Sequence, residues 1–263
     1  MEVVNFRVGN RLVAFNILDI LLTEKFTNDQ TSVPTDDSAF LGVKDFMGVP
    51  TPIYDLSIAM NKTSTKHQNK ELVELLHLRE KDHVDWLDAL ENTARTGIEF
   101  TKAKDPHQCA FGKWYDSFTT TNMDLAEVLK KFDAPHKAIH NLADSVLTLL
   151  EQDKQTEALT LIEVERNSTL ASLRRLFATA RDQVEVTYKP VTVFTTTDGR
   201  RPKLGFVVDK VEDSLHVEKD QIRSLDEIKQ YTGDIDHRVA NMINGLLTAG
   251  HTNSILLSPQ AFI

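Results

Sequence analysis

The chain's only cysteine opens the stretch Cys109-Ala110-Phe111-Gly112-Lys113-Trp114-Tyr115. Downstream lies Pro135-His136-Lys137-Ala138-Ile139-His140, whose two histidines are four residues apart and would share one face of a helix, about 5–6 Å from each other. Upstream, His83 lies on the apolar stripe of another helical pattern. Three imidazoles and one thiolate, brought together by helix packing, would form a closed tetrahedral zinc shell. The sequence therefore predicts Zn²⁺ bound by His83, Cys109, His136 and His140.

These residue types also have ordinary structural roles. A lone cysteine in an apolar context is usually a small buried side chain, and a histidine on a helical stripe is usually a hydrogen-bonded core residue. His107, two residues before the cysteine, is an alternative ligand that would replace one of the four. Trp86, Trp114 and Tyr115 are expected to pack in a helical core rather than line a cofactor site.

The type of zinc site decides between an enzyme and a non-enzyme. A catalytic zinc usually has three protein ligands and an open position, with a carboxylate nearby as base, whereas four ligands fill the shell here. The chain also lacks the H-E-x-x-H motif, the deaminase pattern H-x-E with P-C-x-x-C, and a glycine-rich phosphate loop. We therefore expect no enzyme. A zinc hydrolase is the less favoured alternative, and a purely structural zinc module for protein contacts stays open.

The middle of the chain has the periodicity of long helices. Apolar residues recur at helical spacing from Lys70 to about Thr101, from Leu125 to Leu150 with an interruption at Pro135, and from Leu159 to Val184. Short polar segments separate these stripes. Long helices joined by short connections are typical of an antiparallel four-helix bundle, whose core is a common place for a metal site.

The two ends of the chain have the pattern of short β-strands. Gly9-Asn10 and Asp198-Gly199 each separate apolar runs and predict hairpin turns. Val239 to Leu246 is expected to be a strand, and Asp226 to Gln230 a short helical turn.

Neither end holds enough strands for a complete double barrel, but together they do. The sequence therefore predicts an α+β chain of two domains: a discontinuous β domain of residues 1–60 and 188–263, and a helical bundle of residues 66–186 inserted into one of its loops.

Composition excludes several classes of protein. With 263 residues, 41% hydrophobic and 26% charged, the chain is expected to fold as a soluble protein. No signal peptide or membrane span is recognisable, and one cysteine cannot form an internal disulfide, so a cytoplasmic location is expected. The net charge of −9 argues against nucleic acid and against an anionic membrane surface as partners.

Two segments of the β domain resemble CheW, the coupling protein of bacterial chemotaxis arrays. Gly42 to Leu56 is similar to the family's G-V-I-N-L-R-G-x-V-x-P-V-I-D-L segment, and Leu204 to Val211 to its G-L-x-V-D-x-V strand. The resemblance implies two SH3-like β-barrels. Met47 stands where the family has an arginine on its partner-binding surface, so whether ordinary receptor coupling is retained is an open question.

The helical region resembles the chemoreceptor zinc-binding domain, CZB. The similarity rests on His83 with Trp86, on Cys109 followed by Phe111 to Tyr115, and on Pro135-His136 with His140. In that family the first histidine, the cysteine and the histidine pair are the zinc ligands, and the domain has been linked to sensing zinc and hypochlorous acid. The same four residues are therefore implied as ligands here.

Together the two resemblances imply a chemotaxis scaffold and sensor. The zinc–thiolate domain would sense oxidant or zinc and relay the signal through the CheW-like domain. The expected partners are a CheA-type histidine kinase, chemoreceptors or both, with the protein associated with receptor arrays. The oligomeric state is open, with a homodimer as one option.

Overall fold

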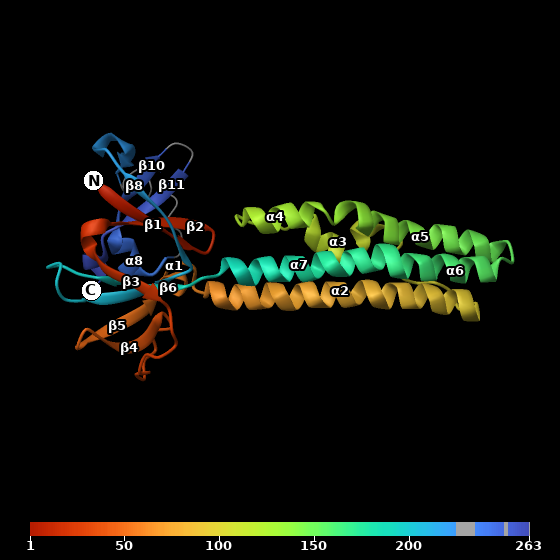
Figure 1. Cartoon of the computed structure of the whole chain (residues 1–263), viewed down its shortest axis with the longest axis horizontal. Helices are drawn as coiled ribbons and strands as arrows, with labels where there is room; N and C mark the ends of the chain where they lie inside the picture. Colours follow the sequence, from red (N-terminus) through yellow and green to blue (C-terminus); the bar gives the residue numbers. More distant parts are fainter. Residues whose placement is uncertain (225–234, 250–251, 263) are drawn as a thin grey trace. The chain divides into compact units, whose positions relative to one another are not determined.

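The computed structural model describes residues 1–224, 235–249 and 252–262. The chain divides into two compact units: Met1–Gln68 with Tyr188–Ile263, here called the β unit, and Asn69–Thr187, here called the helical unit. Figure 1 shows both units coloured along the sequence. The short helical turn predicted at Asp226 to Gln230 lies outside the described residues.

The β unit contains two sheets and two short α-helices in the described part of the chain. Its elements are β1 (Glu2–Val8), β2 (Arg11–Asn16), the 3-10 turn η1 (Ile17–Asp19), β3 (Ile20–Lys25), β4 (Phe40–Phe46), β5 (Val49–Asp55), α1 (Leu56–Asn61), β6 (Val191–Thr195), β7 (Leu204–Val208), β8 (Lys210–His216), η4 (Lys219–Gln221), β9 (Ile222–Arg223), α8 (His237–Met242), β10 (Ile243–Ala249), β11 (Thr252–Leu257) and η6 (Pro259–Phe262).

The two sheets are built by exchange between the two ends of the chain. One has the strand order β8-β1-β2-β11-β10-β9 and the other β3-β6-β7-β5-β4. In each sheet, strands from the two ends meet twice: once in a parallel pair, β2 with β11 or β5 with β7, and once in an antiparallel pair, β1 with β8 or β3 with β6. The remaining pairs are antiparallel. Neither end of the chain forms either sheet alone.

The hairpin predictions agree with the observed pairing. Val8 pairs with Arg11 across Gly9-Asn10, and Thr195 pairs with Leu204 across the turn that contains Asp198. β5 alternates between buried and partly exposed positions, whereas β7 is buried along its whole length, so both faces of β7 are covered.

The strand predicted at Val239 to Leu246 is wrong in its first half. Residues up to Met242 form α8, and the strand β10 begins only at Ile243. The Asp236 side chain accepts a hydrogen bond from the backbone N–H of Arg238 and caps the helix. Val239 and Met242 are buried at helical spacing, a signal too short to outweigh the strand-like composition.

The chain runs four times along the length of the helical unit, and each run is here called a pass. The first pass is α2, whose first turn precedes Asn69, where the helical unit begins. Its elements are α2 (Thr65–Thr96), η2 (Pro106–Gln108), α3 (Ala110–Tyr115), α4 (Met123–Lys130), α5 (Asp133–Glu151), α6 (Gln155–Glu165), the π-helical turn η3 (Arg166–Leu170) and α7 (Ala171–Thr187).

The passes alternate in direction, as predicted for a bundle, but they are not equally helical. Figure 1 shows α2 and α7 side by side, with α4 and α5 forming the opposite rod. Ion pairs from Arg166 to Asp88 and from Arg181 to Glu80 join the last pass to α2. The second pass is largely irregular and contains only η2 and the six-residue α3. The predicted α+β fold, with two sheets and a helical insertion, is therefore confirmed, with this difference in the second pass.

The ends of α2 differ from the predicted range because capping, not periodicity, decides them. Ser64 accepts a hydrogen bond from the N–H of His67 through its side chain, so the helix begins at Thr65, several polar residues before the apolar stripe. Gly97 has φ +72° and its N–H donates to the carbonyl of Thr93, which ends the helix after Thr96.

Pro135 lies in the first turn of α5, after the break between α4 and α5. The first backbone N–H groups of a helix have no partner within it, so a proline there costs no hydrogen bond. No helix in the described part of the chain is long and apolar enough to cross a membrane.

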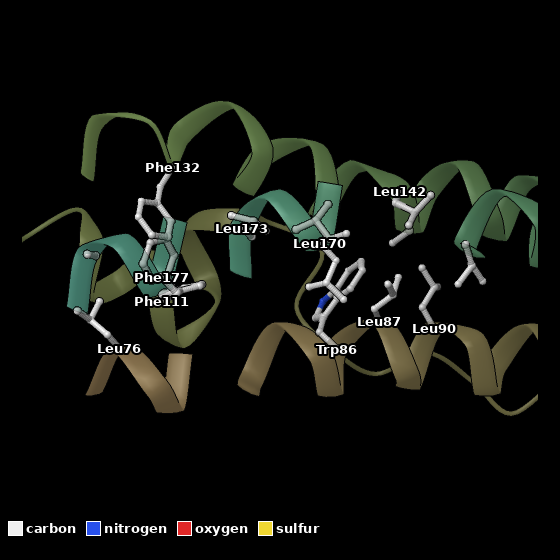
Figure 2. Packing of buried hydrophobic residues seen from close by; sticks show 14 of the residues in the cluster. Leu76, Trp86, Leu87, Leu90, Phe111, Phe132, Leu142, Leu170, Leu173 and Phe177 are labelled. Atoms are coloured by element: carbon white, nitrogen blue, oxygen red, sulfur yellow. The ribbon is translucent and has the colours of Figure 1, made fainter. Parts of the chain in front are cut away.

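Aromatic rings form the centre of the helical unit. Figure 2 shows Phe111 of the second pass, Phe132 before α5 and Phe177 of α7 pointing toward one another. The ring centre of Phe111 lies 5.2 Å from that of Phe132 and 5.2 Å from that of Phe177, and all three side chains are fully buried. Phe111 thus fixes the short α3 against the long helices, and Trp86 is buried in the same core, as expected.

We predict that the two units fold separately. A fragment of residues 66–186 should be helical and stabilised by zinc, whereas residues 1–60 joined to 188–263 through a short linker should fold as β structure, because each unit has its own apolar core. Circular dichroism of both fragments measures this. A helical fragment that stays unfolded even with zinc would contradict it.

Candidate metal centre

The structure brings the four predicted ligand residues together inside the helical unit. One ligand atom from each of His83, Cys109, His136 and His140 lies within 4.8 Å of the other three. The histidines are at most 4% exposed, and the cysteine is half-buried. The residues come from α2, the second pass and α5, so packing of three passes is needed to assemble the group.

Backbone carbonyl groups orient two of the imidazole rings. The Nδ1 of His83 lies 2.7 Å from the carbonyl oxygen of Arg79, and the Nδ1 of His140 lies 3.1 Å from that of Ala103. A carbonyl oxygen can only accept, so both Nδ1 atoms carry the proton. Their Nε2 atoms therefore each carry a lone pair, and both atoms are buried without a hydrogen-bond partner among the described residues.

Cys109 is held at the beginning of α3. Its sulfur accepts a hydrogen bond from the N–H of Gly112 at 3.1 Å and lies 3.2 Å from the carbonyl oxygen of Pro106. A Cβ atom at Gly112 would lie 1.9 Å from that same carbonyl oxygen, so a larger residue cannot occupy this position without moving the loop. The glycine therefore allows the tight loop that points the sulfur at the histidines.

Neighbouring rings close the other sides of the cluster. The sulfur of Cys109 lies 3.3 Å from the Nε2 of His136. Phe111 packs edge-on against His136 with ring centres 4.9 Å apart, and Phe177 lies 5.7 Å from His83. These apolar rings lower the local dielectric constant on their side of the cluster, which strengthens electrostatic interactions within it.

Burial sets the protonation of these groups. It lowers the pKa of His83, lowers that of His136 to about 3 with help from the neighbouring imidazoles, and lowers that of His140 to about 4. Burial also raises the pKa of the Cys109 thiol. At neutral pH the three imidazoles are therefore uncharged, which is the form that donates a lone pair to a metal ion.

The donor set and its spacing fit zinc. With zinc–nitrogen bonds of about 2.0–2.1 Å and a zinc–sulfur bond of about 2.3 Å, a tetrahedron places its ligand atoms about 3.3–3.7 Å apart. The sulfur and His136 are already at that distance, and the largest separations need to shrink by about 1 Å. The two buried Nε2 atoms without partners are the groups that such an ion would satisfy.

His107, the alternative ligand, lies outside the cluster. Its side chain is exposed, and its Nδ1 lies 2.9 Å from a carboxylate oxygen of Asp116, which raises its pKa. Sequence reasoning missed the supporting groups. The carbonyl of Arg79 is one helical turn before His83 and could have been found from that spacing, but the carbonyl of Ala103 belongs to an irregular segment with no periodicity.

Comparison with known proteins supports the assignment of the helical unit. The family model of the chemoreceptor zinc-binding domain matches residues 83–147, a range that begins at His83 and includes the other three cluster residues. The predicted resemblance to this domain is thus confirmed. No curated protein matched the chain.

Among solved structures, the crystal structure of the scaffolding protein TtCheW from Thermoanaerobacter tengcongensis is similar to the chain. The identity is 11% and the TM-score 0.40, over 98% of this chain and 88% of that one.

The depressed histidine pKa values predict that the metal-free chain loses stability in acid. The unfolded histidines take up protons below about pH 6.5, whereas the folded ones stay neutral until about pH 4 or 3. Between these values the unfolded state binds more protons, so the free energy of unfolding should fall by about 1.4 kcal/mol per pH unit for each such histidine. Urea unfolding in EDTA, followed by circular dichroism from pH 7.5 to 4.5, measures the slope.

Two variants control this measurement. His140→Leu should reduce the slope by about one proton, because it removes one buried imidazole. His77→Gln changes an exposed histidine on the same helix as His83 and is the matched control. A slope unaffected by His140→Leu would contradict the protonation states given above.

Proposed function

We propose that this chain is a chemotaxis signalling scaffold whose helical unit is a zinc–thiolate sensor. The observation that carries the proposal is the cluster of His83, Cys109, His136 and His140 within the segment matched by the zinc-binding family model. The β unit would supply the scaffold function, and the protein would act in the cytoplasm in association with receptor arrays.

The four residues would hold the metal through three Nε2 atoms and one sulfur. Bound zinc would keep the Cys109 sulfur as a thiolate at neutral pH, although burial alone favours the thiol. The carbonyl oxygens of Arg79 and Ala103 would keep two imidazoles in the tautomer that donates from Nε2. Gly112 would donate its N–H to the sulfur and limit its negative charge.

A thiolate is the form of cysteine that oxidants attack. With hypochlorous acid, the sulfur of Cys109 would take the oxygen and chloride would leave, so that thiolate and hypochlorous acid give sulfenic acid and chloride. The oxidised sulfur is a weaker donor than the thiolate. The second pass would then be released from the histidines, and it can shift without unwinding a long helix because it is mostly irregular.

A structural change in the helical unit would be transmitted to the β unit through the two segments that connect them. On the entry side, the N–H of Thr65 donates to the hydroxyl of Ser57, which donates to the buried carboxylate of Asp55. On the exit side, the N–H of Lys189 donates to the backbone carbonyl of Asp209. Both connections therefore end on hydrogen-bonded, buried positions.

The proposed partners are a CheA-type histidine kinase, a chemoreceptor or both. The segments that resemble CheW form the β4–β5 hairpin with the start of α1, and β7 with the start of β8. Met47 lies in the hairpin turn with φ +55° and is 68% exposed, as expected for a partner-facing position. A homodimer would be compatible with this role.

A structural zinc module is the second candidate. The four ligands would fill the zinc shell, which is typical of a structural site and also argues against the hydrolase alternative. What favours a sensor is the half-buried cysteine, because a sulfur that reagents can reach is not needed for a structural role.

The first test is zinc and its release by oxidant. Elemental analysis of the purified chain should find about one zinc per chain, and X-ray absorption should find one sulfur and three nitrogen ligands. Modest hypochlorous acid should form sulfenate at Cys109, detected by mass spectrometry with a sulfenate trap, while hydrogen exchange increases in residues 103–118. Thiol reductants should reverse both changes.

Two variants sharpen this test. Cys109→Ser should bind zinc more weakly and lose the response to oxidant while the bundle stays folded, whereas His107→Gln should behave as the unchanged chain because His107 lies outside the cluster. A shell of only nitrogen and oxygen ligands would overturn the site. Oxidation only at large excess, or unchanged exchange in residues 103–118, would leave zinc with a structural role.

The partner proposal is tested at Met47. Replacing it by arginine should strengthen binding to a CheA-type kinase or a chemoreceptor tip, because arginine supplies a forked hydrogen-bond donor that methionine lacks. Isothermal titration with each partner measures the affinity, and Met123→Arg, at an exposed methionine of the helical unit, is the control. Absence of binding for both Met47 forms would favour an unrelated scaffold role.

A further inference from the structure

The backbone of the second pass meets two helices at the carbonyl oxygen of Ala103. This oxygen accepts one hydrogen bond from the indole N–H of Trp86 at 2.8 Å and another from the Nδ1 of His140 at 3.1 Å. A backbone carbonyl oxygen has two lone pairs, so both of them are in use. A single atom therefore joins α2, the second pass and α5.

Few other contacts hold this part of the second pass in place. Residues 98–104 belong to no helix or strand, and no backbone–backbone hydrogen bond joins them to the described part of the chain. Lys104 pairs with Asp144, but both side chains are more than half exposed, and such ion pairs contribute little to stability. Apart from His140 itself, the Trp86 indole is thus the buried hydrogen-bond donor that holds this segment.

The Trp86 side chain is itself fixed by its surroundings. It extends from α2 into the core and is 5% exposed (Figure 2). Its ring centre lies 5.2 Å from that of Phe100, which packs edge-on against it, and 5.0 Å from that of His140. Because Trp86 follows His83 by three residues, the two share one face of α2. The same helix face thus carries one cluster residue and a hydrogen bond that acts on another.

The shared carbonyl lies at the edge of an open cleft. Trp86, Ala103 and His140 all line this cleft of about 390 Å³, which lies between α2 and the second pass and reaches Cys109. Water in the cleft can compete for the carbonyl oxygen, so its position depends on the donors that hold it. Burial lowers the pKa of His140, and backbone groups of Ala103 and Lys104 act in the opposite direction, so a shift of this segment would change the hydrogen bonding of the ring.

We propose that Trp86 is a positioning residue of the candidate metal centre. Its indole N–H holds the Ala103 carbonyl at the place where that oxygen fixes the Nδ1–H tautomer and the ring orientation of His140. The proposal deepens the proposed function and rests on it in one respect, that the Nε2 of His140 donates to a metal ion. Hydrogen-bonded groups behind metal-binding histidines typically change metal affinity about 10–100-fold. If Trp86 served only to pack the core, its removal would lower stability and leave the tautomer of His140 unchanged.

The tautomer of His140 in the metal-free chain tests this directly. Trp86→Phe keeps an aromatic ring and removes the N–H. Nitrogen-15 NMR of the full chain in EDTA reports which ring nitrogen carries the proton, and the His140 signal is identified by its loss in His140→Leu. We expect the Nδ1–H form alone in the unchanged chain and a mixture of both tautomers in Trp86→Phe.

A second replacement separates the hydrogen bond from packing. Benzothienylalanine introduced at position 86 has the shape of tryptophan but carries sulfur in place of the N–H, and it should give the same mixture of tautomers. Circular dichroism checks that each variant folds, and the analogue of equal shape decides the question if Trp86→Phe does not fold.

Zinc affinity provides the second measurement. In competition with a chelator, both replacements at position 86 should weaken zinc binding by about tenfold. Trp114→Phe is the matched control, because Trp114 also packs in the core beside Phe111 but its indole N–H has no hydrogen-bond partner in the described part of the chain. It should leave the tautomer of His140 and the zinc affinity unchanged.

The outcomes separate this proposal from the proposed function. A chain that binds zinc, with the Nδ1–H form of His140 or the zinc affinity unchanged by both replacements at position 86, would overturn the role of Trp86 and leave the sensor intact. A chain that binds no zinc, but whose His140 tautomer changes with Trp86, would overturn the sensor and leave Trp86 as the residue that orients His140.

Discussion

Three imidazole nitrogens and one sulfur share a small volume inside an apolar core, and the helical unit depends on how they are satisfied. A buried polar group without a partner costs about 1–3 kcal/mol, and two of these nitrogens have none among the described residues. No side-chain donor among the described residues satisfies these two nitrogens. The carbonyl oxygens of Arg79 and Ala103 accept hydrogen bonds from Nδ1 of His83 and His140, so the lone pairs on the two Nε2 atoms face the centre of the cluster. A cation at the centre of the cluster would accept these lone pairs and stabilise the folded helical unit.

The irregular second pass follows from the same requirement. A cysteine on a long helix would be fixed by that helix, whereas Cys109 lies between the short elements η2 and α3, which the Phe111 ring and the Tyr115 hydroxyl, donating to the carbonyl of Leu129, join to the core. Few backbone hydrogen bonds must break for this segment to move, so its opening costs less than global unfolding. The same irregular backbone leaves the cleft beside α2, through which the sulfur can be reached.

Helical spacing identifies the three histidines of the cluster, whereas Cys109 is identified by the stretch Phe111 to Tyr115 that follows it and by the resemblance to the zinc-binding domain. His136 and His140 are one helical turn apart, and His83 lies on an apolar stripe, so each falls on the inner face of its helix. The ends of α2 were misplaced because caps at Ser64 and Gly97 decided them. The helix α8 has only six residues, too few for a clear period, so its composition predicts a strand.

The order of residues by itself determined the fold class, the insertion of helices between two β segments, and the donor types of the candidate metal centre, because these depend on periodicity and side-chain chemistry. Tertiary structure alone decided how strands from the two ends interleave through β2–β11 and β5–β7, since parallel pairing joins residues far apart in the chain. It also decided which carbonyl oxygens orient His83 and His140 and which charges face Cys109. Backbone carbonyls are the same in every residue, so only their positions in space distinguish them.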